Sequence, residues 1–194
     1  MPIRSWRPLA LGLAAALVCA VPAAPQDASL ERRIEECGGC HGADGNSPTE
    51  GIPSIAGQPE MFLVNQLILI REGVRPVEVM KPFVEGLTDA EIVAIAEHFS
   101  GLAATASDEP VDPALVERGA ALAERRRCGS CHGADLAGQD QIPRIAKQRV
   151  EYLFHALKEF RDGTRRGADT LMSLAVAGLS NADLEALAHY AASR

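Results

Sequence analysis

Aromatic residues are scarce in this chain of 194 residues. They make up 4% of the sequence, and the single tryptophan, Trp6, lies at the extreme N-terminus. A core with so few aromatic rings must be filled by aliphatic side chains or by a group that is not protein. The hydrophobic and charged fractions, 47% and 23%, are ordinary for a globular protein. They argue against a disordered chain, and the length allows one or two domains.

A surplus of positive charge is also missing. The net charge of −7 argues against nucleic acid as a partner, because phosphate backbones are bound by surplus Lys and Arg. Strand-like alternation of apolar and polar residues is rare, so the sequence favours an all-α fold. The five cysteines, an odd number, suit neither a dense disulfide scaffold nor an ordinary cytosolic enzyme.

The only long uncharged apolar run in the sequence lies near the N-terminus. Residues 1–24 are typical of a secretory signal peptide, in which Arg4 and Arg7 precede an uncharged run over residues 9–21. That run is shorter than the ~20 residues that span a bilayer. A retained membrane anchor and lipidation of Cys19 are the alternatives. Cleavage predicts an exported chain without stable membrane insertion, and it leaves four cysteines for an oxidising compartment.

The rest of the chain contains an internal repeat. A segment with two cysteines and a histidine occurs twice, 91 residues apart, as Cys37-Gly-Gly-Cys40-His41-Gly-Ala-Asp and as Cys128-Gly-Ser-Cys131-His132-Gly-Ala-Asp. Further segments repeat in the same order: Ile52-Pro53-Ser54-Ile55-Ala56 as Ile142-Pro143-Arg144-Ile145-Ala146, Gln58 as Gln148, and Arg71-Glu72-Gly73 as Arg161-Asp162-Gly163. Two units of about 80 residues indicate duplicated domains rather than a solenoid. We place them at residues 25–105 and 106–194, joined by the small, polar segment 101–110.

Each repeat is predicted to contain about three core helices and long connections. Helices over residues 60–72 and 150–162 are each followed by a glycine, which is typical of a helix end. Capping residues mark three helix starts: Thr88 with Glu91, Ser180 with Asp183, and Asp112 before Pro113. The helix that begins at Asp112 is expected to run toward Cys128, and its counterpart from about Ser29 toward Cys37.

The two Cys-x-x-Cys-His segments contain the chemistry. On one helical turn, residues i, i+3 and i+4 share a face, so Cys37, Cys40 and His41 can all face one planar group. Two thiols can attach covalently to haem, and the adjacent imidazole can then bind its iron. The same spacing in the second repeat predicts a second haem c, held by Cys128, Cys131 and His132.

Three other interpretations of these cysteines compete with haem. A thioredoxin-type redox pair would require a βαβ context that the helical pattern lacks. A zinc site would have to gather ligands from two motifs that lie 91 residues apart, whereas structural zinc favours a compact cluster. Plain disulfides within each motif are the third alternative. The occurrence of two such motifs behind a signal peptide favours haem.

Methionine is the predicted ligand on the other side of each iron. Met80 and Met172 follow their histidines by 39 and 40 residues, whereas Met61 aligns with Glu151 and has no counterpart. The remaining histidines do not recur in the repeat and are expected on the surface or in packing: His98, His155 and His189. The predicted iron ligands are therefore His41 with Met80 and His132 with Met172. An iron saturated by imidazole and thioether has no open position for a substrate, so it transfers electrons and the protein is not an enzyme.

A haem would also account for the missing aromatic residues. Domains of about 80 residues bury little apolar surface, and a large flat cofactor supplies the centre that aromatic side chains would otherwise fill. We therefore expect each half to lose its fold without haem.

The paired motifs resemble the dihaem cytochrome c4 family, which consists of two tandem cytochrome c domains. The resemblance covers nearly all of the chain after residue 24, and order and spacing agree in both halves. It implies a periplasmic electron carrier with redox protein partners, delivering electrons toward a terminal oxidase. Related dihaem chains serve as cytochrome subunits of dehydrogenases, which is the alternative; a dihaem peroxidase is a third, and it would need an iron without its methionine.

The resemblance also implies roles around the haem. Pro53 and Pro143 would accept a hydrogen bond from the histidine ring N–H through their backbone carbonyls. Gln58 and Gln148 match family positions near the haem, without an assignable contact. Phe62 departs from the pattern, because Tyr152 occupies the equivalent place in the second repeat and only a tyrosine has a hydroxyl to offer a haem propionate.

Charge is divided unevenly between the halves. Residues 25–105 have a balance of −8 and residues 106–194 a balance of −1, with Arg125, Arg126 and Arg127 directly before Cys128. This asymmetry could orient the protein toward a partner. Since positive charge disfavours oxidation of a nearby iron, it also predicts the higher potential for the C-terminal haem. Ordinary solvated surface charge is the alternative.

Overall fold

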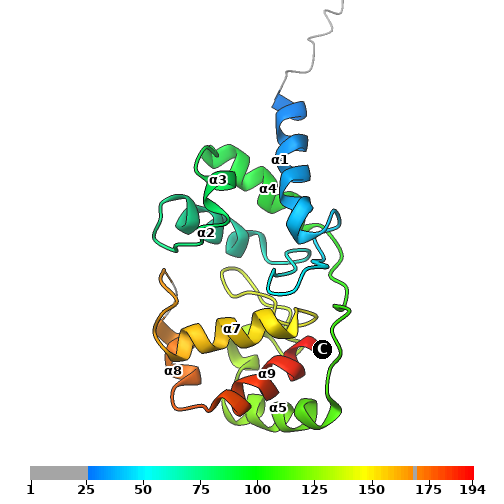
Figure 1. The fold of residues 1–194 in the computed structure, drawn as a ribbon, viewed down its shortest axis with the longest axis vertical. Helices are drawn as coiled ribbons and strands as arrows, with labels where there is room; N and C mark the ends of the chain where they lie inside the picture. The colour runs from blue at the N-terminus through cyan, green and yellow to red at the C-terminus, as the bar shows by residue number, and fades with distance from the viewer. Residues whose placement is uncertain (1–25, 168–169) are drawn as a thin grey trace, which may run out of the picture.

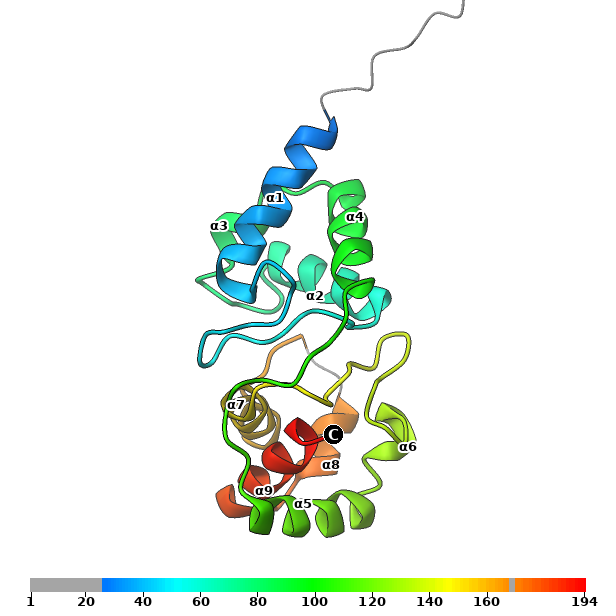
Figure 2. The ribbon, with the colours of Figure 1, turned by 90° about the vertical axis from the view of Figure 1, so that its right-hand side faces the viewer.

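The computed structural model describes residues 26–167 and 170–194, and the predicted signal peptide, residues 1–24, lies outside them. Within those ranges the regular elements are helices, with one isolated β-bridge between Gln139 and Ile142, so the predicted all-α fold is confirmed. The chain forms two lobes stacked end to end (Figure 1). The segment between α4 and α5 runs along the outside of both lobes (Figure 2).

Three long helices and one or two short ones form each lobe. The N-terminal lobe contains α1 (Gln26–His41), α2 (Glu60–Arg71), α3 (Lys81–Val84) and α4 (Asp89–Ser100). The C-terminal lobe contains α5 (Pro113–Arg125), α6 (Gly129–His132), α7 (Val150–Arg161), α8 (Thr170–Val176) and α9 (Asn181–Ala192). The prediction of about three core helices per lobe therefore covers the long elements and omits α3, α6 and α8. These have four to seven residues, too few for a periodic pattern to be visible.

The predicted helix ends form as expected from local chemistry. The Thr88 hydroxyl accepts from the Glu91 backbone N–H while the Glu91 carboxylate accepts from the Thr88 N–H, and Ser180 with Asp183 forms the same reciprocal cap at α9. The Asp112 carboxylate accepts from the second and third residues of its helix. At the other ends of α2 and α7, Gly73 and Gly163 adopt positive φ angles of 68° and 67°.

The two lobes differ where the chain enters the cysteine motif. In the N-terminal lobe α1 continues without a break through both cysteines to His41. In the C-terminal lobe α5 ends at Arg125, Arg127 adopts a left-handed φ of 58°, and α6 begins anew at Gly129. Both helices run toward their cysteines as expected. The helix of the first lobe is continuous through the motif, whereas a turn interrupts that of the second lobe.

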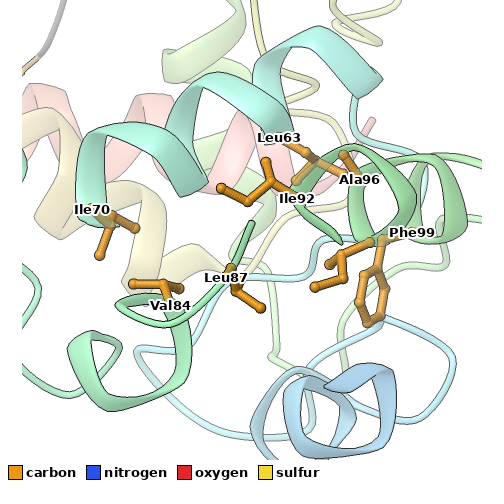
Figure 3. Packing of buried hydrophobic residues seen from close by; sticks show 8 residues of the cluster. Leu63, Ile70, Val84, Leu87, Ile92, Ala96 and Phe99 are labelled. Carbon is orange, nitrogen blue, oxygen red and sulfur yellow. The ribbon is translucent and has the colours of Figure 1, made fainter. Parts of the chain in front are cut away.

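The N-terminal lobe has one apolar core, formed between α2, α3 and α4 (Figure 3). Leu63 and Ile70 lie two turns apart on α2. Leu63 lies beside Ile92 of α4, and Ile70 lies beside Val84 of α3 (Figure 3). Cys37 and Met80, which are 43 residues apart in the sequence, are partly buried against this same core.

The core of the C-terminal lobe is divided into two clusters. One gathers around Leu122, Val176 and Leu184, and the other around Leu136 and Leu153 with the last turns of α9. Cys128 and Met172 are partly buried against the first cluster only. In both lobes, therefore, a cysteine and a methionine lie at the margin of one apolar cluster, whether or not the core is divided.

The closest helix packing in the described part of the molecule depends on a glycine. A Cβ added at Gly119 of α5 would lie 2.0 Å from the Ala186 carbonyl oxygen and 2.7 Å from the Tyr190 Cβ, both on α9. These distances are far below any real contact, so α5 and α9 can cross this closely only because residue 119 has no side chain. The crossing fixes the helix that leads into the second cysteine motif.

Helices α8 and α9, with a bend of 112° between them, satisfy length and composition criteria for a membrane span only when taken together, and in the described ranges no single helix does.

Substituting Gly119 by alanine is expected to destabilise the C-terminal lobe by about 2–3 kcal/mol, because the backbones of α5 and α9 must separate to admit a methyl group. Chemical denaturation of the holoprotein measures the change. Gly101→Ala is the matched control, since its Cβ would meet its nearest atoms at an ordinary 3.6 Å. Equal free energies of unfolding for the two variants would contradict the conclusion that the crossing of α5 and α9 requires a glycine at position 119.

Asp183 gives the cap of α9 a pH dependence. Hydrogen bonds from Ser180, followed by the one from Arg118, lower the pKa of Asp183 from 3.8 to about 2. A lowered folded-state pKa adds stability above the unfolded value, and this is lost as the pH falls through the folded value. Asp183→Asn should therefore reduce the free energy of unfolding at neutral pH, and the difference should vanish between pH 3.8 and about 2. Glu185→Gln, on the same helix but outside the cap, is the matched control and should leave the free energy of unfolding at neutral pH nearly unchanged.

Candidate functional site

The four cysteines of the repeated motif take equivalent positions in the two lobes. Cys37 and Cys128 are half-buried against the cores, and Cys40 and Cys131, one helical turn later, are exposed. All four are free thiols, so the disulfide alternative is not realised. Burial raises the pKa of Cys37 to about 11 and raises that of Cys128 as well. Both inner thiols are thus held neutral beside apolar side chains.

Each motif histidine is buried and held by a proline carbonyl. His41 Nδ1 donates to the Pro53 carbonyl at 2.8 Å, and His132 Nδ1 donates to the Pro143 carbonyl at 2.9 Å. The contacts implied by the family resemblance are confirmed. Burial lowers the pKa of both imidazoles, and the proline hydrogen bonds oppose that shift in part. A neutral ring with its proton fixed on Nδ1 has the lone pair of Nε2 available to a metal.

The two methionines lie at matching places relative to these motifs. Met80 immediately precedes α3 and Met172 lies in α8, and each is partly buried against the same apolar cluster as the inner cysteine of its lobe. Met61, which has no counterpart in the repeat, is 49% exposed on α2. The structure therefore places Cys37 and Met80 against one apolar cluster and Cys128 and Met172 against another, and leaves Met61 at the surface.

The remaining histidines have other surroundings. His98 packs edge-on against the ring of Phe99, His155 is exposed with its Nε2 3.6 Å from Glu151, and His189 Nδ1 accepts from the Asp112 backbone N–H. Across the described residues, no three Cys, His, Asp or Glu side chains gather in a way that could hold a metal ion. The four cysteines and two histidines thus do not form the cluster that the zinc alternative required.

Gln58 and Gln148 make a reciprocal contact between the lobes. Gln148 Oε1 accepts from the Ser54 backbone N–H at 2.7 Å, and its Nε2 donates to the Ser54 carbonyl at 2.8 Å. Gln58 does the same to Arg144, at 3.0 and 2.9 Å. Sequence reasoning gave these residues no contact, because their partners belong to the other lobe. The only signal was that the two glutamines recur in the repeat.

Two arginines of the C-terminal lobe are buried at the same boundary. Arg144 is 5% exposed and donates to the Ala56 carbonyl at 2.9 Å, and burial lowers its pKa to about 10. Arg149 donates to the Ser47 carbonyl at 2.7 Å and pairs with Asp108 and Glu109 of the segment between the lobes. These charges, counted above as part of a surface asymmetry, face the N-terminal lobe instead of solvent.

A second cationic group joins the lobes on the side of α2 and α7. Arg165 donates to the Tyr152 hydroxyl at 3.3 Å and pairs with Glu159, and Arg75 of the other lobe contacts the same tyrosine. Burial alone would raise the pKa of Tyr152, but Arg165 and Arg75 outweigh it and hold that pKa below its usual value. Two largely buried guanidinium groups around one hydroxyl form an environment that favours an anion.

Comparison with known proteins identifies the class. A family model described as cytochrome c matches residues 116–193, the C-terminal lobe from α5 to α9. The chain therefore contains the fold of a c-type cytochrome, in which haem is bound covalently through Cys-x-x-Cys-His.

Relatives over the whole chain identify the family. Cytochrome c4 of Pseudomonas aeruginosa is 34% identical over 179 residues, 87% of this chain and 88% of that protein. The thiosulfate dehydrogenase electron acceptor of Thiomonas intermedia is 31% identical and covers 100% of this chain and 93% of its own length. The crystal structure of reduced recombinant cytochrome c4 from Pseudomonas stutzeri matches with a TM-score of 0.78 at 32% identity, covering 88% of this chain and 99% of that one.

The chain belongs to the cytochrome c4 family, with two tandem cytochrome c domains. Members of this family are electron-transfer proteins with covalently bound haem c and are not enzymes, and both properties hold for this chain. The residue boundaries 25–105 and 106–194 remain predictions.

The residues present fit haem c. Each lobe offers one half-buried and one exposed thiol, a buried imidazole with a fixed tautomer, and a thioether that is partly buried against the same apolar cluster as the inner thiol. Large apolar side chains beside the methionines are exposed on the protein alone, with Val79 at 72% and Leu174 at 69%. A flat apolar ring would cover such surface, and the arginine pair at Tyr152 offers cations to its carboxylates.

Proposed function

We propose that this chain is a dihaem electron carrier with one haem c in each lobe. The first haem is attached to Cys37 and Cys40, with His41 and Met80 as iron ligands. The observation that supports this assignment is the pairing of inner cysteine and methionine on one apolar cluster in each lobe.

The second haem is attached to Cys128 and Cys131, with His132 and Met172 as iron ligands. Bound haem c supplies a one-electron couple, and sulfur ligation favours its reduced form. The protein's own contribution is to hold the imidazoles neutral through Pro53 and Pro143 and to exclude water with the apolar clusters. With both ligand positions filled by protein, the carrier exchanges electrons with other proteins and binds no substrate at the iron.

The partners of this carrier are proposed to be redox proteins on the periplasmic side, with the signal peptide over residues 1–24 directing export. Delivery of electrons toward a terminal oxidase is the leading pathway. Service as the electron acceptor of a dehydrogenase is the second candidate, and the similarity to the thiosulfate dehydrogenase electron acceptor of Thiomonas intermedia favours it. Co-purification of a dehydrogenase with the native protein would distinguish the second pathway from the first, and N-terminal sequencing of the exported chain tests the cleavage.

The methionine assignment can be tested by removing one sulfur at a time. Met80→Leu and Met172→Leu should each lower the potential of one haem, because a ligand that stabilises the reduced iron is lost. Each substitution should also change the optical spectrum of one of the two haems. The pyridine haemochrome assay should still find two haems per chain. Met61→Leu is the matched control and should leave both potentials unchanged. An unchanged potential in Met80→Leu or Met172→Leu would refute the assignment.

The order of the two potentials follows from charge. We expect the C-terminal haem to have the higher potential, because its lobe contains Arg125, Arg126 and Arg127 beside Cys128 while residues 25–105 are strongly acidic. Redox titration of the wild type, with each haem assigned from the two methionine variants, measures the order. The reverse order would show that the local surroundings of the iron outweigh the net charge of the lobe.

A further inference from the structure

The reciprocal glutamine contact meets each histidine contact at a single peptide group. The carbonyl of Pro53 and the N–H of Ser54 belong to one peptide unit. The carbonyl accepts from His41 Nδ1 at 2.8 Å, and the N–H donates to Gln148 Oε1 at 2.7 Å. A continuous line of hydrogen bonds therefore leads from the histidine of the N-terminal lobe to a side chain of the C-terminal lobe.

The second lobe repeats the arrangement in the opposite direction. The peptide unit between Pro143 and Arg144 accepts from His132 Nδ1 at 2.9 Å through its carbonyl and donates to Gln58 Oε1 at 3.0 Å through its N–H. Both glutamines are buried, with Gln148 2% and Gln58 5% exposed, so water cannot readily take over either contact. The arrangement is crossed: each glutamine acts on the histidine of the lobe to which it does not belong.

A peptide that donates through its N–H becomes a better acceptor at its carbonyl, because hydrogen bonds in a chain polarise one another. A stronger acceptor draws the Nδ1 proton away from the imidazole and makes Nε2 a more basic ligand. A more basic ligand stabilises the oxidised form of an iron and thereby lowers its potential.

We infer that Gln148 lowers the potential of the haem in the N-terminal lobe and that Gln58 lowers the potential of the haem in the C-terminal lobe, each through the peptide between the lobes. The two glutamines are positioning residues, and this role rests on the proposed ligation of iron by His41 and His132. It also ties each potential to the placement of the other lobe, so that separation of the lobes raises both.

The test is a pair of substitutions that control for each other. Gln148→Met in the holoprotein removes the acceptor for the Ser54 N–H while keeping side-chain volume, and should raise mainly the potential of the N-terminal haem. Gln58→Met should raise mainly that of the C-terminal haem. If a substitution only loosened the contact between the lobes, it would change the potentials of both haems alike. The crossed pattern therefore distinguishes an effect through one peptide from a general loss of contact between the lobes.

A second readout is the Nδ1 proton of each haem-bound histidine in the NMR spectrum of the reduced protein. Its resonance should move upfield, as for a weakened hydrogen bond, for His41 in Gln148→Met and for His132 in Gln58→Met. Asn46→Ala is the neutral control: it breaks the hydrogen bonds of Asn46 to Ala103 and Thr105 and touches neither peptide. If Gln148→Met or Gln58→Met fails to fold, Gln148→Asn and Gln58→Asn serve instead. The shorter side chain lengthens the hydrogen bond from the peptide N–H, and the potential should shift less but in the same direction.

Three results would overturn the inference: equal shifts of both haems in each variant, a shift confined to the haem of the substituted lobe, or no shift. Failure of the proposed function would look different. It would be visible in the unsubstituted protein, as a haem count other than two or as spectra without histidine and methionine ligation. Failure of the inference alone leaves those properties intact and removes only the crossed pattern.

Discussion

A hydrogen bond from a buried imidazole to a proline carbonyl fixes the histidine of each Cys-x-x-Cys-His motif, and contacts from both lobes hold the segment that supplies this carbonyl. The proline lies in an irregular segment, where the chain has no helix to hold it. The Ala56 backbone N–H donates to the Gly45 carbonyl, and the next peptide after Pro53 is held by Gln148 from the other lobe. The histidine is therefore oriented by contacts that neither its own helix nor its own lobe supplies in full.

Local chemistry explains why the ends of several helices could be predicted from the sequence. Helix caps depend on residues three positions apart, so Thr88 with Glu91 and Ser180 with Asp183 could be placed correctly without knowledge of the fold. The roles of the cysteines, histidines and methionines at the haem stay predictions, and they rest on spacing and on the repeat. The proline contacts came from family resemblance, and the distances to His41 and His132 agree with it.

What could not be predicted depends on how separate elements meet. Gly119 is unremarkable in the sequence, and its necessity appears only where α5 crosses α9. Arg144 and Arg149 count as ordinary charges until the lobes are placed, after which both are buried against carbonyls of the N-terminal lobe. The left-handed turn at Arg127 likewise has no sequence signature, because non-glycine residues seldom adopt that conformation.

The boundary between the lobes is polar, and this has a physical consequence. Two apolar faces would hold the lobes together with little preference for one orientation, because hydrophobic burial is non-directional. Amide-to-backbone contacts are directional, and a buried amide left without its partner is costly. The two glutamines therefore specify one relative orientation of the duplicated lobes. Because the peptides that they hold are also the histidine acceptors, the same contacts that orient the lobes also reach the histidines of both Cys-x-x-Cys-His motifs.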